Sequence, residues 1–303
     1  MKKIKLGVLF SRLRLEEKLL FEEARKRKDV ELVPIDSREL ILSLDEHPKL
    51  DVILDREISQ SRALYALQLF EGSDVWTVNS FEAVRIGGDK MLTSKVLHDA
   101  GVPTPNVKIA FTKESALGAI EEIGYPVVLK PVDGSWGRLM AKIENRTAAE
   151  AILEHKAHLS SYYHTVFYIQ EYVKKPDRDI RAYVIDGETI GAAYRVSDHW
   201  LTNAALGGRT IPCPVTPELN ELCLRACKAV GGQAIAVDLM ETPHGLTVHE
   251  VNCAMEFKAS MQSIEKNIPA LLIDYCVKAA QGHQPKPKAT LKTGDKTKAM
   301  AHA

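Results

Sequence analysis

Three oxygen-bearing side chains in the last quarter of the chain have the spacing of a metal site. Two apolar, β-branched runs flank a Pro/Gly turn, Glu241–Gly245, which predicts a β-hairpin. In that register Asp238 faces Val248, and strand alternation places Asp238, Glu250 and Asn252 on one face of the sheet. Asp238 and Glu250 are then diagonal neighbours with Cα atoms about 7–8 Å apart, close enough for both side chains to reach one ion.

The chemistry of these three groups selects the ion. Two carboxylates and an amide, with no His or Cys among them, form a hard oxygen set that suits Mg²⁺ or Mn²⁺ rather than Zn²⁺. The alternative is a hairpin whose acids are ordinary solvated charges. The rest of the chain decides between these two interpretations.

A glycine-rich segment between two expected strands has the composition of a phosphate-binding loop. The segment Asp133–Arg138 reads Asp-Gly-Ser-Trp-Gly-Arg, and Lys130 precedes it. Glycines let backbone N–H groups approach phosphate oxygens, and the cations neutralise phosphate charge. The Walker pattern Gly-x-x-x-x-Gly-Lys-Ser/Thr does not occur in the sequence. Taken alone, the segment is equally compatible with a plain mobile turn.

Two arginines lie on a second expected hairpin. Arg181 belongs to the strand Ile180–Ile185 and Arg195 to the strand Thr189–Val196, which are joined by a turn at Asp186-Gly187. A charged residue among Ala, Val and Tyr indicates that Arg181 lines a pocket. A salt bridge at the sheet edge is the alternative.

The N-terminal part alternates strands and helices, which predicts a small doubly wound α/β domain over residues 1–86. Its strands are expected at Ile4–Phe10, Val30–Ile35, Asp51–Glu57 and Val75–Asn79. Its helices are expected at Leu15–Lys28, directly after Asp36-Ser37, and at Ser59–Glu71, the last two opened by capping residues. It lacks a Gly-x-Gly-x-x-Gly fingerprint, so no dinucleotide site is predicted.

The remainder has a mixed α+β pattern in two expected domains, residues 87–169 and residues 170–282, the second carrying the metal site. The expected helices are Asp89–Ala100, Lys113–Ile123, Ala148–Leu159, Pro217–Val230 and Ala270–Ala280. The other expected strands are Val107–Phe111, Pro126–Val132, Leu139–Ile143 and Val166–Val173. Residues 283–303 hold two prolines and five lysines without an apolar period, which predicts a disordered tail.

Composition narrows the class of partner. The chain has 303 residues and a net charge of zero, which argues against nucleic acid or an anionic membrane as the main partner. No apolar run approaches the length of about 18 residues that a spanning helix needs. Five cysteines without a Cys-x-x-Cys pair fit a reducing, cytoplasmic location.

The order of several motifs resembles that of a known superfamily, the ATP-grasp ligases. The motifs are Lys90, Lys130-Pro131, the Gly-Ser-Trp-Gly segment, Gln-Glu-Tyr-Val at 170–173, Arg178-Asp179-Ile180-Arg181, and Asp238 with Glu250-Val251-Asn252. The resemblance runs from the N-terminus to about Gly282. Within the superfamily the chain resembles the RimK-like branch. More narrowly it resembles the LysX-type ligases of lysine biosynthesis, through Gly-Ser-Trp-Gly-Arg, His199-Trp200-Leu201-Thr202-Asn203 and Met-Glu-Phe-Lys at 255–258.

The resemblance implies an ATP-grasp fold in which two α+β domains enclose ATP. It assigns ATP binding to residues with distinct roles. The two lysines are expected to bind the α- and β-phosphates, and the glycine-rich loop to cover them. The backbone of Glu171 and Val173 is expected to contact the adenine edge, and Asp179 to lie near the ribose. The full set is Lys90, Lys130, Gly134, Ser135, Trp136, Gly137, Arg138, Gln170, Glu171, Tyr172, Val173, Arg178, Asp179 and Arg181.

The resemblance also implies the reacting centre. Asp238, Glu250 and Asn252 are expected to hold Mg²⁺ (or Mn²⁺) against the phosphates. Arg195 and Asn203 are expected to stabilise the developing oxyanion and the leaving phosphate, and Arg181 to meet the phosphates or a substrate carboxylate. No general base is assigned, because alternation places His249 on the opposite face from Glu250.

The activity implied is that of an ATP-dependent carboxylate–amine ligase, which forms an amide through an acyl phosphate. By resemblance it joins 2-aminoadipate to the C-terminal glutamate of a small acidic amino-group carrier protein. The alternatives are a glutamate ligase acting on the carrier of arginine synthesis, on a ribosomal protein or on a coenzyme, and a non-catalytic ATP-binding module. Leu206 and the stretch 258–268 depart from the family pattern and leave the identity of the amino acid open.

An acidic carrier requires a local cationic surface, even on a ligase without net charge. Scattered solvated charges are the alternative, and the oligomeric state stays open, with a homo-oligomer among the possibilities. The expected docking cations are Arg12, Arg14, Arg56, Arg62, Lys174, Lys175 and Arg178.

Overall fold

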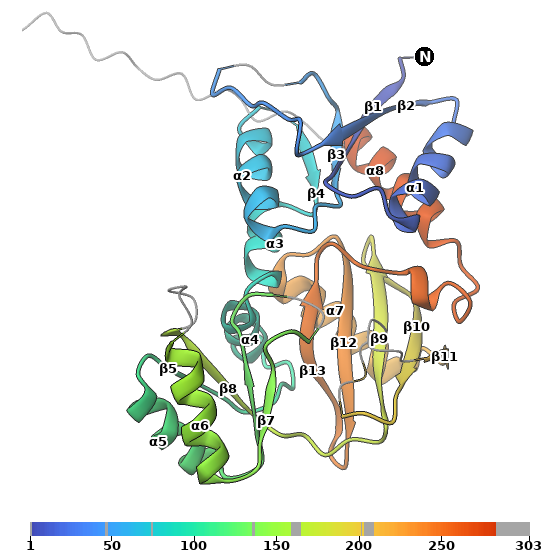
Figure 1. The fold of residues 1–303 in the computed structure, drawn as a ribbon. Helices are drawn as coiled ribbons and strands as arrows, with labels where there is room; N and C mark the ends of the chain where they lie inside the picture. The colour runs from blue at the N-terminus through green and yellow to red at the C-terminus, as the bar shows by residue number, and fades with distance from the viewer. Residues whose placement is uncertain are drawn as a thin grey trace, which may run out of the picture.

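A computed structural model describes residues 2–45, 48–73, 75–134, 137–158, 165–200, 202 and 209–282. Three sheets organise this part of the chain, one in each lobe of the molecule (Figure 1). None of the helices described is both long and apolar enough to cross a membrane. Ser135, Trp136, Asn203, Leu206 and the tail 283–303 lie outside the described residues.

The first sheet is parallel, with the strand order β2-β1-β3-β4. Its strands confirm the four predicted ones, and helices α1 and α2 confirm the two long predicted helices. The strands are β1 (Ile4–Phe10), β2 (Val30–Asp36), β3 (Val52–Asp55) and β4 (Trp76–Val78), and the helices are α1 (Leu15–Lys26), α2 (Gln60–Glu71) and α3 (Phe81–Gly87).

Three details of this lobe differ from the prediction. A turn replaces the helix expected after Asp36-Ser37, because the Asp36 carboxylate binds the backbone N–H and the guanidinium of Arg38. Ser59 occupies the N-cap position of α2 without a capping hydrogen bond from its side chain. The short helix α3 was not predicted, and its N-cap Ser80 accepts from the backbone N–H of Ala83.

The last helix, α8 (Ile268–Gly282), returns to this lobe and lies beside α1 (Figure 1). Leu272, Ile273 and Cys276 of α8 are buried in one cluster with Leu6 and Val8 of β1. The two ends of the described chain therefore share a core. Its packing holds the first sheet against the rest of the molecule.

The second sheet is antiparallel, with the order β5-β8-β6-β7, and two helices cover one face of it. Val127 and Leu129 face those helices in the core, so alternation turns Val128 and Lys130 to the opposite face. The elements are β5 (Val107–Ala110), β6 (Val127–Lys130), β7 (Ala141–Ile143), β8 (Phe167–Glu171), α4 (Lys90–Asp99), α5 (Lys113–Ile123) and α6 (Arg146–Ala157). The N-cap of α4 is Asp89, whose carboxylate accepts from the backbone N–H groups of the first helical turn.

The third sheet is antiparallel, with the order β11-β10-β9-β12-β13, and α7 packs on one face. The edge strand β11 was not predicted. The elements are β9 (Arg178–Ile185), β10 (Glu188–Val196), β11 (Arg209–Cys213), β12 (Ala234–Thr242), β13 (Gly245–Asn252), α7 (Pro217–Val230) and a short 3₁₀ turn, η3 (Lys258–Ser260).

The hairpin β12–β13 has a register different from the predicted one. Thr242 pairs with Gly245 across a tight turn, and Asp238 pairs with Glu250 rather than facing Val248. Two features cause the difference. The tight turn pairs Met240 with Thr247, one residue beyond the predicted register, and a β-bulge adds a second residue, since Leu239 pairs with Val248 and His249 is left over. The two carboxylates are therefore directly opposite one another, closer than the diagonal pair that was expected.

Candidate active site

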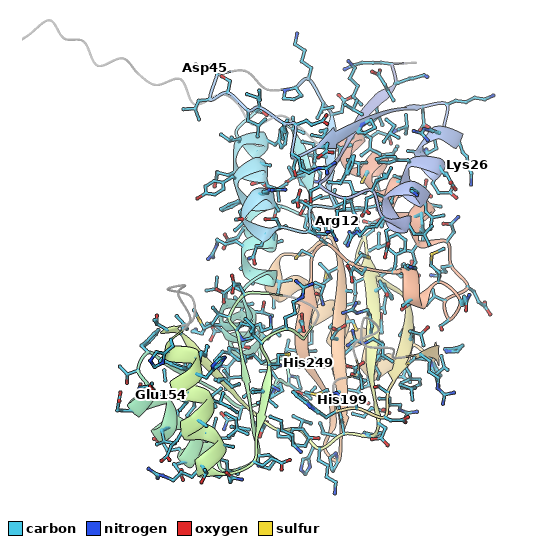
Figure 2. All side chains as sticks on the ribbon, viewed as in Figure 1. Arg12, Lys26, Asp45, Glu154, His199 and His249 are labelled. Atoms are coloured by element: carbon cyan, nitrogen blue, oxygen red, sulfur yellow. The ribbon has the colours of Figure 1, made fainter. Side chains whose placement is uncertain are left out.

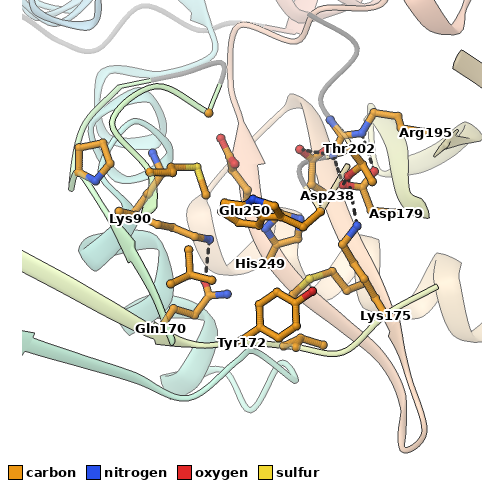
Figure 3. A pocket seen from close by; sticks show the side chains of 18 of the residues that line it. Lys90, Gln170, Tyr172, Lys175, Asp179, Arg195, Thr202, Asp238, His249 and Glu250 are labelled. Carbon is orange, nitrogen blue, oxygen red and sulfur yellow. Dashed lines mark hydrogen bonds and ion pairs between the residues drawn. The ribbon is translucent and has the colours of Figure 1, made fainter. Parts of the chain in front are cut away.

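A pocket lies between the second and third sheets, where the predicted motifs meet (Figure 3). Its walls come from the C-terminal halves of β6 and β8, from the glycine-rich loop and from β9, β10, β12 and β13. Twelve of the predicted site residues line it: Lys90, Lys130, Gly134, Gly137, Arg138, Gln170, Tyr172, Val173, Asp179, Arg195, Asp238 and Glu250.

Two lysines supply positive charge on the side of the second sheet. Lys130 is buried, and its ammonium donates to Oε1 of Gln170 at 2.7 Å. Burial lowers the pKa of Lys130 to about 8, although the nearby carboxylate of Glu250 raises it. Lys90 donates to the backbone carbonyl of Gly134 at 2.7 Å. The glycine-rich loop is thus tied to a cation that is expected to bind phosphate.

The backbone of this loop needs glycine. Gly134 has φ +102, a conformation that other residues rarely adopt, and a Cβ there would meet only Pro131 Cγ at 3.9 Å. Gly137 has φ +68. Without a Cβ at these two positions, the backbone can approach an anion closely.

A cluster of ion pairs occupies the opposite side of the pocket. Arg181 donates to both carboxylate oxygens of Asp238, at 2.7 Å each, and Arg195 reaches Asp238 at 3.1 Å. Arg195 also donates two hydrogen bonds to Asp179, at 2.6 and 2.8 Å, and Thr202 donates to the same carboxylate. Burial alone would raise the pKa of Asp238, but the two arginines hold it well below its usual range.

The donor set of the hairpin fits a divalent cation. Glu250 lies opposite Asp238 and has no hydrogen-bond or ion-pair partner among the described residues, so its carboxylate is available as a ligand. Asn252 pairs with Ala236 and shares the sheet face of Asp238. The described part of the chain holds no cluster of three His, Cys, Asp or Glu residues with metal geometry. Oxygen ligands from two carboxylates and an amide suit Mg²⁺.

Several predicted residues lie outside the lining of this pocket. The carboxylate of Glu171 turns away and accepts from the backbone N–H of Asn106 at 2.8 Å. Arg178 pairs with Glu241 and stacks over Tyr194, with 4.0 Å between the guanidinium carbon and the ring centroid. Arg181 and Asn252 are also not part of the lining; Arg181 binds Asp238, which is.

Most docking cations expected for an acidic carrier are engaged within the protein. Arg56 is buried and donates to Glu17 and to the carbonyl of Met255, so it cannot contact a partner. Arg14 pairs with Glu17 and Glu256, and Lys175 donates to Thr202. The prediction was wrong for Arg56, because its burial depends on contacts distant in sequence. For the partly exposed Arg14 and Lys175 it stays a prediction. Arg12, Arg62 and Lys174 are exposed, and Figure 2 shows Arg12 where the first and third lobes meet.

The pocket also contains residues that were not predicted. Apolar side chains of Val128, Met140 and Met240 line it, as expected for the walls around an aromatic base. Val128 is two residues before Lys130 and Met240 is two after Asp238, so strand alternation could have identified both. Thr202 also lines the pocket, although the sequence places it only in the motif at residues 199–203.

His249 is the largest surprise, because alternation predicted it on the opposite face from Glu250. That prediction was wrong. The β-bulge resets the alternation of β13, and His249 lines the same pocket as Glu250. Burial, together with Lys130, lowers the pKa of His249 to about 4, so the ring is neutral near pH 7.

Comparison with known proteins decides the family. The family model of the RimK-like ATP-grasp domain matches residues 87–276, and that of the LysX preATP-grasp domain matches residues 6–86. The chain belongs to the RimK-like ATP-grasp family. It is an enzyme, an ATP-dependent ligase that joins a carboxylate to an amine.

Individual relatives match over nearly their whole length. The alpha-aminoadipate–LysW ligase LysX of Sulfurisphaera tokodaii is 34% identical over 275 residues, covering 88% of this chain and 96% of that protein. The glutamate–LysW ligase ArgX of the same organism is 34% identical over 269 residues, covering 87% and 94%. The crystal structure of a RimK domain ATP-grasp protein from Sphaerobacter thermophilus has a TM-score of 0.74 at 26% identity, covering 90% and 99%. The predicted ATP-grasp fold is confirmed.

Proposed function

We propose that this ligase joins the amino group of 2-aminoadipate to the C-terminal glutamate of a small acidic carrier protein of the LysW kind, in lysine biosynthesis. The observation that carries the proposal is the match to LysX along both parts of the chain: a LysX preATP-grasp domain over residues 6–86, and a LysX relative of which 96% is covered.

The geometry supports a two-step reaction. A carrier carboxylate attacks the γ-phosphorus of ATP, which forms an acyl phosphate and releases ADP. The amine of the amino acid then attacks the acyl carbon, phosphate leaves, and the nitrogen loses a proton. Lys90 and Lys130 bind the phosphates, and the Gly134–Arg138 loop covers them.

The acidic residues of the site have two tasks in this proposal. Asp238, Glu250 and Asn252 hold Mg²⁺, which neutralises phosphate charge when bound. Asp179 fixes the guanidinium of Arg195 through two hydrogen bonds. Arg195 is thereby oriented to stabilise negative charge that develops on the transferred phosphoryl and on the acyl oxygen, and Asn203 shares this role.

Glutamate is the second candidate for the amino acid. ArgX, which is named for glutamate, matches this chain at the same 34% identity as LysX. Either amino acid carries a second carboxylate, and both use the same chemistry at the carrier. The two candidates therefore differ only in the length of one side chain, by a single methylene group.

A single experiment separates the candidates. The protein is incubated with ATP, Mg²⁺, a LysW-type carrier and each amino acid in turn, and the carrier is weighed by mass spectrometry. The proposal expects a mass gain equal to 2-aminoadipate minus water. A gain only with glutamate favours the second candidate, and an unmodified carrier in every mixture refutes the acceptor assignment.

Ionic strength tests how the carrier docks. KM for the carrier should rise steeply with salt while KM for the free amino acid stays nearly constant. Charge reversal at the exposed Arg12 and Arg62 should have the same effect as salt. Lys228→Glu, an exposed site on α7, is the matched control and should leave KM unchanged. A carrier KM that is flat with salt contradicts electrostatic docking.

A further inference from the structure

The β-bulge in β13 presents a histidine to the pocket that no pairing in the sheet requires. Asp238 pairs with Glu250 and Leu239 with Val248, so His249 is the extra residue. Bulges occur next to active sites, where they redirect a side chain and interrupt pairing. The local distortion thus has a consequence for the pocket: it adds an imidazole beside the carboxylate of Glu250.

The ring of His249 is polar, shielded and unpartnered. Both Nδ1 and Nε2 are buried from solvent, and neither has a hydrogen-bond partner in the part of the chain that the structure describes. Charged groups of Lys130, Asp179, Asp238 and Glu250 surround the ring without bonding to it. Buried polar atoms without partners are rare and destabilising, so each one calls for an explanation.

The position of the ring indicates its partner. Figure 3 shows His249 on the floor of the pocket, between Glu250 and Tyr172. Tyr172 belongs to the segment proposed to meet the adenine, and Lys130 and Glu250 belong to the phosphate and metal end. The part of ATP that spans this interval is the ribose with the α-phosphate.

We propose that His249 is a nucleotide-binding residue, whose imidazole hydrogen-bonds the ribose–α-phosphate part of ATP. One ring nitrogen donates and the other accepts, which matches a ribose hydroxyl, and the donor alone matches a phosphate oxygen. His249 thereby adds affinity for the nucleotide through hydrogen bonds. This inference rests on the nucleotide site of the proposed function.

Three variants separate hydrogen bonding from shape. His249→Leu removes both polar atoms and keeps similar bulk, and His249→Asn keeps one donor and one acceptor. His244→Leu is the matched control, the same substitution at an exposed residue of the same hairpin's turn. Binding of ADP, AMP and adenosine is measured by titration calorimetry with chelator present, so that neither turnover nor the metal enters the readout. Thermal unfolding is measured with and without ADP.

The expected result is specific. His249→Leu should weaken ADP binding about tenfold, the effect of losing one or two hydrogen bonds. The same variant should unfold at a higher temperature without nucleotide, because it removes two unpaired buried nitrogens, and should show a smaller ADP-induced shift. His249→Asn should restore most of the affinity, and His244→Leu should behave as the wild type.

The ligand series locates the contact. A loss of affinity already present with adenosine assigns His249 to the ribose, and a loss that first appears with AMP assigns it to the α-phosphate. Equal dissociation constants for wild type and His249→Leu overturn the inference, and so does a loss that Asn fails to restore. If the wild-type protein itself binds no adenine nucleotide, the proposed function fails instead.

Discussion

Asn79 joins the N-terminal lobe to the hairpin that carries the metal ligands, and its replacement tests that joint. Its amide donates to the carbonyls of Ala234 and Cys253, both at 2.7 Å. Its Oδ1 accepts from the backbone N–H groups of Gln233 at 2.7 Å and Ala234 at 2.9 Å. One side chain, 1% exposed, thus holds the start of β12 and the residue that follows β13.

The cost of Asn79→Ala follows from these four hydrogen bonds. Two buried N–H groups lose their acceptor, at about 1–2 kcal/mol each, because no other group replaces it. The two carbonyls keep a second lone pair for other donors and together add about 1 kcal/mol. We therefore expect Asn79→Ala to destabilise the protein by about 4 kcal/mol.

The assay combines urea unfolding with hydrogen exchange at the amides of Gln233 and Ala234. The variant should unfold at lower urea, and these two amides should exchange faster than in the wild type. Asn145→Ala is the matched control, since Asn145 is exposed and caps α6 through one bond to Ala148, at a cost of about 1 kcal/mol. Equal unfolding midpoints for the two variants would refute the role assigned to Asn79.

Three further predictions concern the site, acid stability and the loop. Glu250→Gln should lower kcat by a factor of about 10² to 10³ at saturating Mg²⁺, because one charged ligand is lost, and near-normal turnover would sink the metal assignment. Burial raises the pKa of Asp55 from 3.8 to about 7, so the stability it contributes is full below about pH 4 and is lost as pH rises to about 7. Asp55→Asn should therefore remove up to about 4 kcal/mol of pH dependence, measured by urea unfolding at pH 4 and pH 8, and an unchanged pH profile would contradict it. Amide exchange over Gly137–Met140 should slow when ATP and Mg²⁺ are added, whereas equal rates would make the loop a plain turn.

The features that the sequence predicts well are those set by local periodicity. Leu129 and Ile169 point into the core of the second lobe. Because successive side chains of a strand point to opposite faces, the next residues, Lys130 and Gln170, point toward the pocket. Asp89 caps the start of α4, and Gly231 ends α7 in a left-handed conformation. Both residue types favour these positions for local reasons, so the sequence alone predicts these helix ends.

The features that it misses depend on partners distant in the chain. The bulge at His249 is a feature of the pairing between β12 and β13, and the identity of the residue does not predict it. Arginine is usually exposed, yet Arg56 is buried and donates to Glu17 and to the carbonyl of Met255. The helix expected after Asp36 is an exception, because its absence has a local cause: the Asp36 carboxylate binds Arg38, two residues away, and a turn forms there instead.

The two carboxylates of the metal site differ in the number of hydrogen bonds and ion pairs that they make within the protein, and this difference leads to a last prediction. Asp238 accepts three N–H contacts, two from Arg181 at 2.7 Å and one from Arg195 at 3.1 Å. A carboxylate has about four lone-pair positions, so Asp238 keeps about one for a cation. Glu250 has no partner among the described residues and keeps all of its own. Asp238 is thus as much a structural anchor for two buried arginines as a ligand.

Asp238→Asn should therefore lower the free energy of unfolding much more than Glu250→Gln. Removing the charge of Asp238 leaves Arg181 without its carboxylate partner inside the protein, which should cost about 3–5 kcal/mol. Arg195 keeps Asp179, so the loss stays within that range. Glu250→Gln breaks no ion pair and should change the stability by less than about 0.5 kcal/mol. Urea unfolding without nucleotide measures both variants, and equal stabilities would show that the arginines do not depend on Asp238.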